Sequence, residues 1–419
     1  MEESNRYLIV GGSAAGISAA HSIRMHDRIG KITVLSEEAD QPYFRPMIPF
    51  LVSGKKRAED IFMHGRGPYT QKGITIKSGC RVVKVDPSKQ VVKLMDKQEL
   101  SYEKILFATG SRPYIPKELS KVKAEGLFAL RTLSDARNMS RQVEKTDHAV
   151  MLGGGLLNLK AAFALLEKGV KVTLVVRSPE VLSQLMEPED AFLIRRALDR
   201  AGLEIKTGFS VKEVVEEKGS IKGVVLDNAK EISCQMVCIG KGVTPNVDFL
   251  EGSKIVIDNG IATDRFTACN LPNTFAAGDV AVTYDPISSE RIVTALWTNA
   301  VEMGRCAGKN MAGVKTAYSG TFGILNATQV ADEPFVSMGQ VHTDKGGFEV
   351  HCSSSDKFYR KIVFDKTGDK LIGAVFVGDI SNAGMYRYVI REKMAVHSIK
   401  KHIINHTLHY GHLLNNRQK

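Results

Sequence analysis

Two short stretches of the chain have the spacing of turns that hold the phosphates of a dinucleotide. The first, GGSAAG at residues 11–16, follows the apolar run RYLIV. Glycine at its first position permits a tight turn after a strand, and glycine at its last position lets the following helix pack close to that turn. The middle position holds a small serine, and the N–H groups of a helix N-terminus can still meet a pyrophosphate there. The residues predicted to bind a dinucleotide here are Gly11, Gly12, Ser13, Ala14, Ala15 and Gly16.

An acidic residue follows the first turn at a useful distance. Glu37 ends the second apolar run, KITVLSEE, about twenty residues after Gly16. A carboxylate at this point is suited to hydrogen bonds with the hydroxyls of an adenosine ribose. Glu38, its neighbour, is the alternative candidate.

The second turn, in MLGGGLLNLKAA at residues 151–162, keeps Gly153 and Gly155 but departs from the usual pattern after them. Asn158 replaces the third glycine, which should push the helix and strand slightly apart. The next apolar run ends in Arg177 rather than in an acid. A basic residue at that position can accommodate the 2′-phosphate of NADP, and the alternative is an exposed arginine past the end of a strand.

Length and composition bound the remaining possibilities. A chain of 419 residues predicts two or three domains. No apolar run approaches the ~20 residues of a membrane helix, and the first residues lack a basic-then-apolar pattern, so we expect a cytoplasmic protein without a membrane contact. The net charge of +11 fits a solvated basic surface or an acidic protein partner, and no basic–aromatic motif indicates nucleic acid.

The cysteines and histidines do not have metal-ligand spacing. The six cysteines are scattered without a C-x-x-C pair, which favours reduced and mostly buried thiols. Several histidines gather near the end of the chain without an acid or cysteine among them, which favours an amphipathic helix or a docking surface. We therefore expect no metal site. The histidines are His397, His402, His406, His409 and His412.

The elements that must position these turns alternate along the chain. Apolar strand, glycine turn, helix and strand occur in that order twice, with strand-like runs ending in ATGSRP and TFAAGDVA outside them. A helix rich in small residues is predicted over residues 292–313, and beyond residue 313 a strand–turn–strand pattern and a helical region predict a small α+β domain.

The ordered landmarks VGGSAAG, ATGSRP, GGG, IGKGVTPN and TFAAGDVA resemble the two-dinucleotide-domain flavoproteins related to pyridine nucleotide-disulfide oxidoreductases. The resemblance implies an α/β fold of two nested Rossmann-like domains plus a small C-terminal α+β domain. The implied bounds are 1–112 and 245–313 for the FAD domain, 113–244 for the NAD(P) domain and 314–419 for the C-terminal domain. FAD would occupy the first turn, and NADH or NADPH the second.

The stretch PYFRP, together with the absence of cysteine before residue 80, resembles the thiol-lacking branch of that family: NADH:rubredoxin and ferredoxin reductases and the FAD part of nitrite reductases. This implies hydride transfer from a reduced pyridine nucleotide to flavin and single-electron transfer to a small iron–sulfur protein, with no catalytic acid or base. A homodimer through the C-terminal domain is also implied. The alternatives are an NADH oxidase that reduces oxygen, and an electron-transfer flavoprotein subunit with an impaired nicotinamide site.

The resemblance also assigns further site residues. Lys160 replaces the glutamate that approaches the nicotinamide in the family, and Phe50 stands where ferredoxin reductases carry a lysine. Trp297 would lie near the flavin, with simple core packing as the alternative. The FAD residues added in this way are Arg45, Pro46, Val82, Ala108, Thr109, Gly110, Arg112, Gly278, Asp279 and Trp297. The NAD(P) residues are Gly153, Gly155, Leu156, Leu157, Asn158, Lys160, Arg177 and Gly240.

Overall fold

The computed structural model describes residues 5–63, 69–285, 290–320, 325–344 and 346–417. The chain divides into two compact units, which are described separately. Unit 1 comprises Met1–Tyr114, Arg131–Arg137 and Gly242–Thr321, and unit 2 comprises Ile115–Leu130, Asn138–Lys241 and Phe322–Lys419. Residues 131–137, expected in the intervening domain, thus belong to unit 1. The predicted α/β class with a C-terminal α+β part is confirmed.

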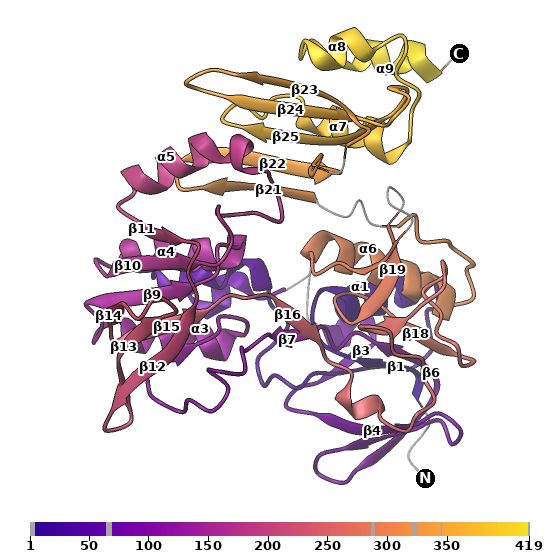
Figure 1. The fold of residues 1–419 in the computed structure, drawn as a ribbon. Helices are drawn as coiled ribbons and strands as arrows, with labels where there is room; N and C mark the ends of the chain where they lie inside the picture. The colour runs from indigo at the N-terminus through magenta and orange to yellow at the C-terminus, as the bar shows by residue number, and fades with distance from the viewer. Residues whose placement is uncertain (1–4, 64–68, 286–289, 321–324, 345, 418–419) are drawn as a thin grey trace. The chain divides into compact units, whose positions relative to one another are not determined.

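Unit 1 is built on a largely parallel sheet (Figure 1), whose central strands β1 and β6 are apolar and buried toward their carboxyl ends. Strands buried on both faces have such continuous apolar runs. The sheet order is β3-β2-β1-β6-β5-β4, with β18 also beside β6. The strands of unit 1 are β1 (Asn5–Val10), β2 (Ile32–Leu35), β3 (Ile74–Lys77), β4 (Val82–Asp86), β5 (Val91–Leu94), β6 (Glu99–Phe107), β7 (Ser111–Pro113), β16 (Val243–Pro245), β17 (Ile261–Ala262), β18 (Thr274–Ala276), β19 (Ala281–Tyr284) and β20 (Arg291–Val293).

Two helices of unit 1, α1 (Ala14–His26) and α6 (Trp297–Met311), pack against each other at very short range (Figure 1). A β-carbon added to Gly304 would lie 2.2 Å from the carbonyl oxygen of Ala15, and one added to Gly308 would lie 2.5 Å from that of Ala19. The small residues noted in the sequence of α6 therefore allow this crossing. The other helical turns of unit 1 are η1 (Arg45–Met47), α2 (Pro49–Val52), η2 (Ala58–Ile61), η3 (Tyr69–Lys72), η5 (Asp248–Leu250) and the start of α3 (Leu133–Val143).

Unit 2 contains a second parallel sheet, in the order β11-β10-β9-β15-β8. A smaller antiparallel sheet, β12-β13-β14, is inserted in the chain between β11 and β15 of the parallel sheet. The elements of this part are β8 (Leu127–Phe128), β9 (His148–Leu152), α4 (Leu156–Leu166), β10 (Lys171–Val176), η4 (Pro188–Ala191), α5 (Phe192–Arg200), β11 (Glu204–Thr207), β12 (Val211–Glu217), β13 (Ser220–Leu226), β14 (Glu231–Ser233) and β15 (Met236–Ile239).

The last part of unit 2 is an antiparallel sheet in the order β21-β22-β25-β24-β23, followed by three helices. A buried ion-pair cluster ties β24 to η4: Lys361 pairs with Glu187 and lies 3.6 Å from Asp190, which also accepts a hydrogen bond from Tyr359. These elements are β21 (Leu325–Val330), β22 (Glu333–Gly339), β23 (Glu349–Ser354), β24 (Tyr359–Phe364), β25 (Leu371–Val377), α7 (Ala383–Arg391), α8 (Lys400–Ile404) and α9 (Tyr410–Arg417).

Across the described ranges, no helix combines the length and apolar character needed to span a bilayer.

Candidate functional site

The first glycine turn fits glycine alone at two of its positions. Gly11 has a φ of +122°, and a β-carbon there would lie 2.0 Å from the carbonyl oxygen of Ala108. A β-carbon on Gly16 would lie 1.9 Å from the carbonyl oxygen of Gly11. Ser13 caps α1 with an extended backbone and makes no capping hydrogen bond with its side chain. The N-terminal N–H groups of α1, which have no partner within the helix, are therefore presented at a turn without side-chain bulk.

Three predicted segments meet at one edge of the sheet of unit 1. Val10 and Ala276 both pair with Phe107 in parallel, so β1, β6 and β18 end at the same level. The turns that follow these strands are 11–16, 108–110 and 278–279. Gly278 lies so close to Ala15 that a β-carbon added to the glycine would contact the Ala15 side chain. Ligands of open α/β sheets bind outside the carboxyl ends of the strands, which is where these turns lie.

The two candidate ribose acids differ in their surroundings. The side chain of Glu37 is 65% exposed at the end of β2 and faces Arg81 at 3.4 Å. Glu38 instead accepts hydrogen bonds from the Tyr43 hydroxyl and the Arg45 guanidinium, each at 2.6 Å. Of the two, Glu37 is the acid that remains accessible to a ribose at this edge.

Asp279 of the AAGD turn has a partner that the sequence analysis did not single out. Arg131 Nη2 donates to its carboxylate at 2.8 Å, and the Ser111 hydroxyl donates to the same oxygen at 3.0 Å. Arg131 stands just before α3, where the Asp135 carboxylate accepts hydrogen bonds from the N–H groups of Arg131 and Thr132. The sequence does contain a signal for this helix start: Asp135 stands three residues after Thr132, a spacing typical of an N-terminal cap.

The remaining predicted FAD residues of unit 1 have varied surroundings. Arg45 donates to Glu38 and, through Nη1, to the Arg131 carbonyl at 2.7 Å. Arg112 is exposed and pairs with Asp248 at 3.1 Å, while Thr109 exchanges two hydrogen bonds with Asn246. Trp297 begins α6, partly buried, with its ring centroid 5.9 Å from that of Phe44. Val82 is buried at the start of β4, and Pro46 is exposed in η1.

The second glycine turn resolves the question that Asn158 raised. Gly153 has a φ of +103°, and a β-carbon there would lie 2.3 Å from the Gly240 carbonyl oxygen. Asn158 is buried and donates from Nδ2 to the Gly153 carbonyl at 2.6 Å. A β-carbon on Gly240 would lie 2.6 Å from the Asn158 Cγ atom. The asparagine amide thus occupies space that Gly240 leaves open, and it closes the turn with a hydrogen bond.

Three cations lie in the segments that adjoin this turn in unit 2. Lys160 lies half-buried on α4, Arg177 follows β10 and Lys241 follows Gly240. Burial lowers the pKa of Lys160, and burial together with the charge of Arg177 lowers the pKa of Lys241. Within the described ranges, none of the three forms an ion pair with a carboxylate. Leu156 and Leu157, at the start of α4, are half-buried and exposed.

Two thiols of unit 1, those of Cys269 and Cys306, are buried among protein atoms. Burial raises the pKa of Cys269 to about 12 and that of Cys306 to about 11, so both are protonated at neutral pH. Cys80, which follows the PYFRP segment, is partly exposed.

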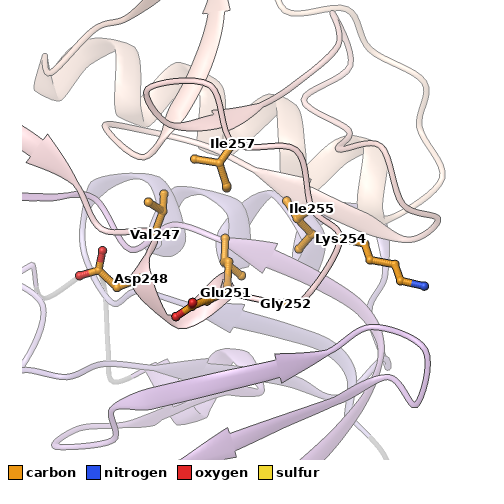
Figure 2. A pocket seen from close by; sticks show the side chains of 8 residues that line it. Val247, Asp248, Glu251, Gly252, Lys254, Ile255 and Ile257 are labelled. Atoms are coloured by element: carbon orange, nitrogen blue, oxygen red, sulfur yellow. The ribbon is translucent and has the colours of Figure 1, made fainter.

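An open hollow of about 540 Å³ lies elsewhere on unit 1, along one continuous segment (Figure 2). None of the predicted cofactor residues lines it. Its lining residues are Val247, Asp248, Leu250, Glu251, Gly252, Lys254, Ile255 and Ile257.

Both turns fit the dinucleotides that the sequence predicts. Each combines a glycine whose β-carbon would collide with backbone, an uncapped helix N-terminus and a parallel sheet edge. The second adds three cations without carboxylate partners, a surplus of positive charge suited to phosphates.

Comparison with known proteins agrees with this arrangement. Residues 5–304 match the model of the pyridine nucleotide-disulphide oxidoreductase family, and residues 325–394 match that of the rubredoxin NAD+ reductase C-terminal domain. The chain is 29% identical over 414 residues to an NADH-dependent phenylglyoxylate dehydrogenase subunit epsilon of Aromatoleum evansii, covering 98% of this chain and 97% of that protein.

Two further similarities cover most of the chain. It is 27% identical to a rubredoxin-NAD(+) reductase of Ectopseudomonas oleovorans, over 74% of this chain and 80% of the relative. The crystal structure of a covalent putidaredoxin reductase–putidaredoxin complex superimposes with a TM-score of 0.86 at 21% identity, covering 96% of this chain and 99% of that one. The chain therefore belongs to the pyridine nucleotide-disulphide oxidoreductase family and is an oxidoreductase.

Proposed function

We propose that the chain is an FAD-dependent NAD(P)H oxidoreductase that passes electrons to a small iron–sulfur protein of the rubredoxin or ferredoxin type. The observation that carries the proposal is the pair of glycine turns, each at the carboxyl edge of its own parallel sheet, in a chain whose sequence has no cysteine before residue 80. Relatives with rubredoxin reductase names support the acceptor class.

The chain's own residues would bind and orient the cofactors. FAD, when bound, would supply the hydride-accepting and electron-storing chemistry. The N–H groups of α1 and the turn at 11–16 would hold its pyrophosphate, Glu37 its ribose and Asp279 its ribityl region. A hydride would carry two electrons from the nucleotide, and the proton left behind when those electrons pass on singly would be released to water, so no acid or base of the chain is assigned to the reaction.

For the second site, we propose that NADPH is preferred over NADH. Arg177 is exposed at the end of β10, where an acid would otherwise receive the ribose hydroxyls of NADH. Lys160 and Lys241 would add attraction for the pyrophosphate, because neither forms an ion pair within the described ranges, although the charges of Glu118 and Asp227 act on Lys241.

An anaerobic titration of the purified protein tests this proposal. We expect a yellow protein whose flavin absorbance is bleached by NADPH at lower concentrations than by NADH, followed by reoxidation with rubredoxin or ferredoxin. A protein that stays colourless after incubation with FAD contradicts it. Oxygen consumption equal to the rate of acceptor reduction would favour the NADH oxidase alternative.

A second candidate function is supported by the full-length similarity to a subunit of phenylglyoxylate dehydrogenase. In that case the chain would exchange electrons with another subunit of a larger NADH-dependent enzyme. Flavin bleaching by NADH without reduction of free rubredoxin or ferredoxin would favour this role.

Light scattering of the purified chain would test the homodimer proposed for the C-terminal domain.

A further inference from the structure

One segment of unit 2 joins the second glycine turn to the C-terminal antiparallel sheet. It runs from residue 177, directly after β10, to residue 190 in η4, and we call it the 177–190 segment. Its first residue is Arg177, the cation expected to discriminate between the two nucleotides. The way in which this segment is held should therefore affect nucleotide binding.

Near its start, the 177–190 segment packs directly on the glycine turn. The Leu182 N–H group donates to the Gly154 carbonyl at 3.0 Å. A β-carbon added to Gly154 would lie 3.2 Å from the α-carbon of Val181. Leu182 has a φ of +54°, a conformation that residues other than glycine rarely adopt unless the surrounding structure holds them in it. The contact with the turn therefore depends on how the rest of the segment is fixed.

The other end of the segment is fixed to the C-terminal sheet. The Ser337 hydroxyl of β22 donates to the Leu185 carbonyl at 2.6 Å. The Thr343 N–H group donates to the Glu187 carboxylate at 2.6 Å, and the Lys361 ammonium group of β24 donates to the same carboxylate. We call these five residues the C-terminal anchor of the segment.

The ion pair of the C-terminal anchor is withdrawn from water. The side chain of Lys361 is 3% exposed and that of Glu187 is 17% exposed. Burial alone would raise the pKa of Glu187, but the bonds from Lys361 and Thr343 outweigh it and hold this pKa below its usual range. Removal of one partner from a buried pair leaves an uncompensated charge, so the pair resists separation.

A second contact between the same parts of unit 2 lies outside the segment. Arg200, the last residue of α5, pairs with Asp332 and with Glu333, each at 3.2 Å. The helix α5 lies beside β21 and β22 (Figure 1). This contact joins the C-terminal sheet to the nucleotide-binding part without holding the 177–190 segment, and it supplies a matched control.

We propose that Lys361, Glu187 and Ser337 are positioning residues for the second nucleotide, which act by holding the 177–190 segment against the glycine turn. The C-terminal sheet thereby contributes to nucleotide affinity through the segment. This inference rests on the proposed function, because it assumes that the second turn binds NAD(P)H. Without the anchor, Leu182 can separate from Gly154, and Arg177 loses its fixed place at the start of the segment.

Lys361→Met tests the proposal because it removes the ammonium group and keeps an unbranched side chain. The matched control is Arg200→Gln. NADP+ and NAD+, which bind without reducing the flavin, are titrated calorimetrically into the oxidised, FAD-loaded protein. We expect NADP+ binding to Lys361→Met to be weaker by about fivefold or more, a size typical of residues that act on a site from a distance, and NAD+ binding to lose less. Arg200→Gln, which breaks an exposed pair, should change either affinity by about twofold at most.

A second readout follows the segment itself. Hydrogen exchange of residues 178–186, measured by mass spectrometry, reports whether the hydrogen bond from Leu182 to Gly154 stays closed. We expect exchange to be roughly tenfold faster or more in Lys361→Met, because local opening no longer has to break the anchor. Arg200→Gln should exchange like the wild type. Lys361→Arg, which keeps the charge, should recover both slow exchange and most of the NADP+ affinity.

Ser337→Ala provides an independent variant of the anchor. It removes one neutral hydrogen bond and no charge, and it takes the place of Lys361→Met if that variant does not fold. We expect NADP+ binding to weaken by about twofold or more, the equivalent of one hydrogen bond, together with faster exchange in residues 178–186. FAD affinity, which depends on unit 1, should stay at the wild-type value in every variant.

The outcomes distinguish the two proposals. Wild-type protein that binds FAD but neither nucleotide overturns the proposed function and, with it, this inference. Wild-type protein that binds NADP+, with Lys361→Met and Ser337→Ala matching it in affinity and exchange, overturns the positioning role alone. Equal losses of FAD and nucleotide affinity in these variants would show a general loss of structure and would also overturn the positioning role.

Discussion

At the scale of single residues, the second glycine turn depends on a pair of positions far apart in the chain. Gly240→Ala would place a β-carbon 2.6 Å from Asn158 Cγ. We expect it to destabilise unit 2 by about 1–3 kcal/mol, the usual cost of overpacking, and to weaken NADPH binding. Thermal unfolding and nucleotide titration measure both effects. Addition of Asn158→Gly should recover most of the loss; a double variant no better than Gly240→Ala would contradict the pairing.

Arg177 is the residue on which nucleotide preference is expected to depend. Arg177→Glu should weaken NADPH binding roughly 10–100-fold, the equivalent of one charged hydrogen bond of about 1.5–3 kcal/mol, and should change NADH binding little. Binding of both nucleotides to the oxidised protein measures the ratio. Lys171→Glu, at the opposite end of the same strand, is the control and should leave the ratio unchanged. An equal loss for both nucleotides would show that Arg177 does not contact the 2′-phosphate.

The sequence predicts some of these residues well and others not at all. Gly11, Gly16 and Gly153 follow from local rules, since each tight turn between strand and helix needs them. Arg131 could not be assigned, because its partner Asp279 is brought to it only by the tertiary fold. Asn158 and Gly240 are both predicted in the second site, but their packing against each other could not be, because no local pattern connects the two positions.

At the scale of elements, the crossing of α1 and α6 supports the first turn. Gly304→Ala would force a β-carbon to within 2.2 Å of the Ala15 carbonyl oxygen. We expect a loss of about 1–3 kcal/mol and weaker FAD binding, because α1 carries the turn at its N-terminus. Thermal unfolding of the apoprotein and FAD titration check this.

The control for this prediction is another helical glycine. A β-carbon on Gly384 of α7 meets nothing within 4 Å. Gly384→Ala should therefore be neutral or stabilising by up to about 1 kcal/mol, as expected for alanine in a helix. If both variants unfold at the same temperature, the close crossing contributes nothing to stability.

Most strands and helices could be predicted from their periodicity, but the place of residues 131–137 in unit 1 could not. The apolar runs that form β1, β6 and β9 are fully buried, as their composition predicts. Residues 131–137 form a short segment, and tertiary contacts bring them into unit 1: the hydrogen bonds of Arg131 and Tyr43 and the pair of Arg137 with Asp40.

At the scale of the whole molecule, net charge should affect how fast an acceptor arrives. The chain carries +11, and attraction to an acidic partner is screened by salt. We expect kcat/KM for an acidic ferredoxin to fall about tenfold or more between ~0.01 and ~0.15 M ionic strength. Stopped-flow kinetics measure the dependence, with an uncharged quinone as control. A ferredoxin rate that is as insensitive to salt as the quinone rate would exclude electrostatic steering.

The parallel pairing of β6 with β18 also bears on how the protein is made. The first glycine turn and its sheet leave the ribosome early, but the strand that completes the sheet edge is translated only after the whole second nucleotide domain. At about 5–20 residues per second, that interval lasts on the order of 10–30 s. During that interval the edge of β6 that later pairs with β18 is without its partner strand, while β8–β15 are being translated. Nascent chains of this protein should therefore depend on chaperones that shield such edges until synthesis has passed residue 276.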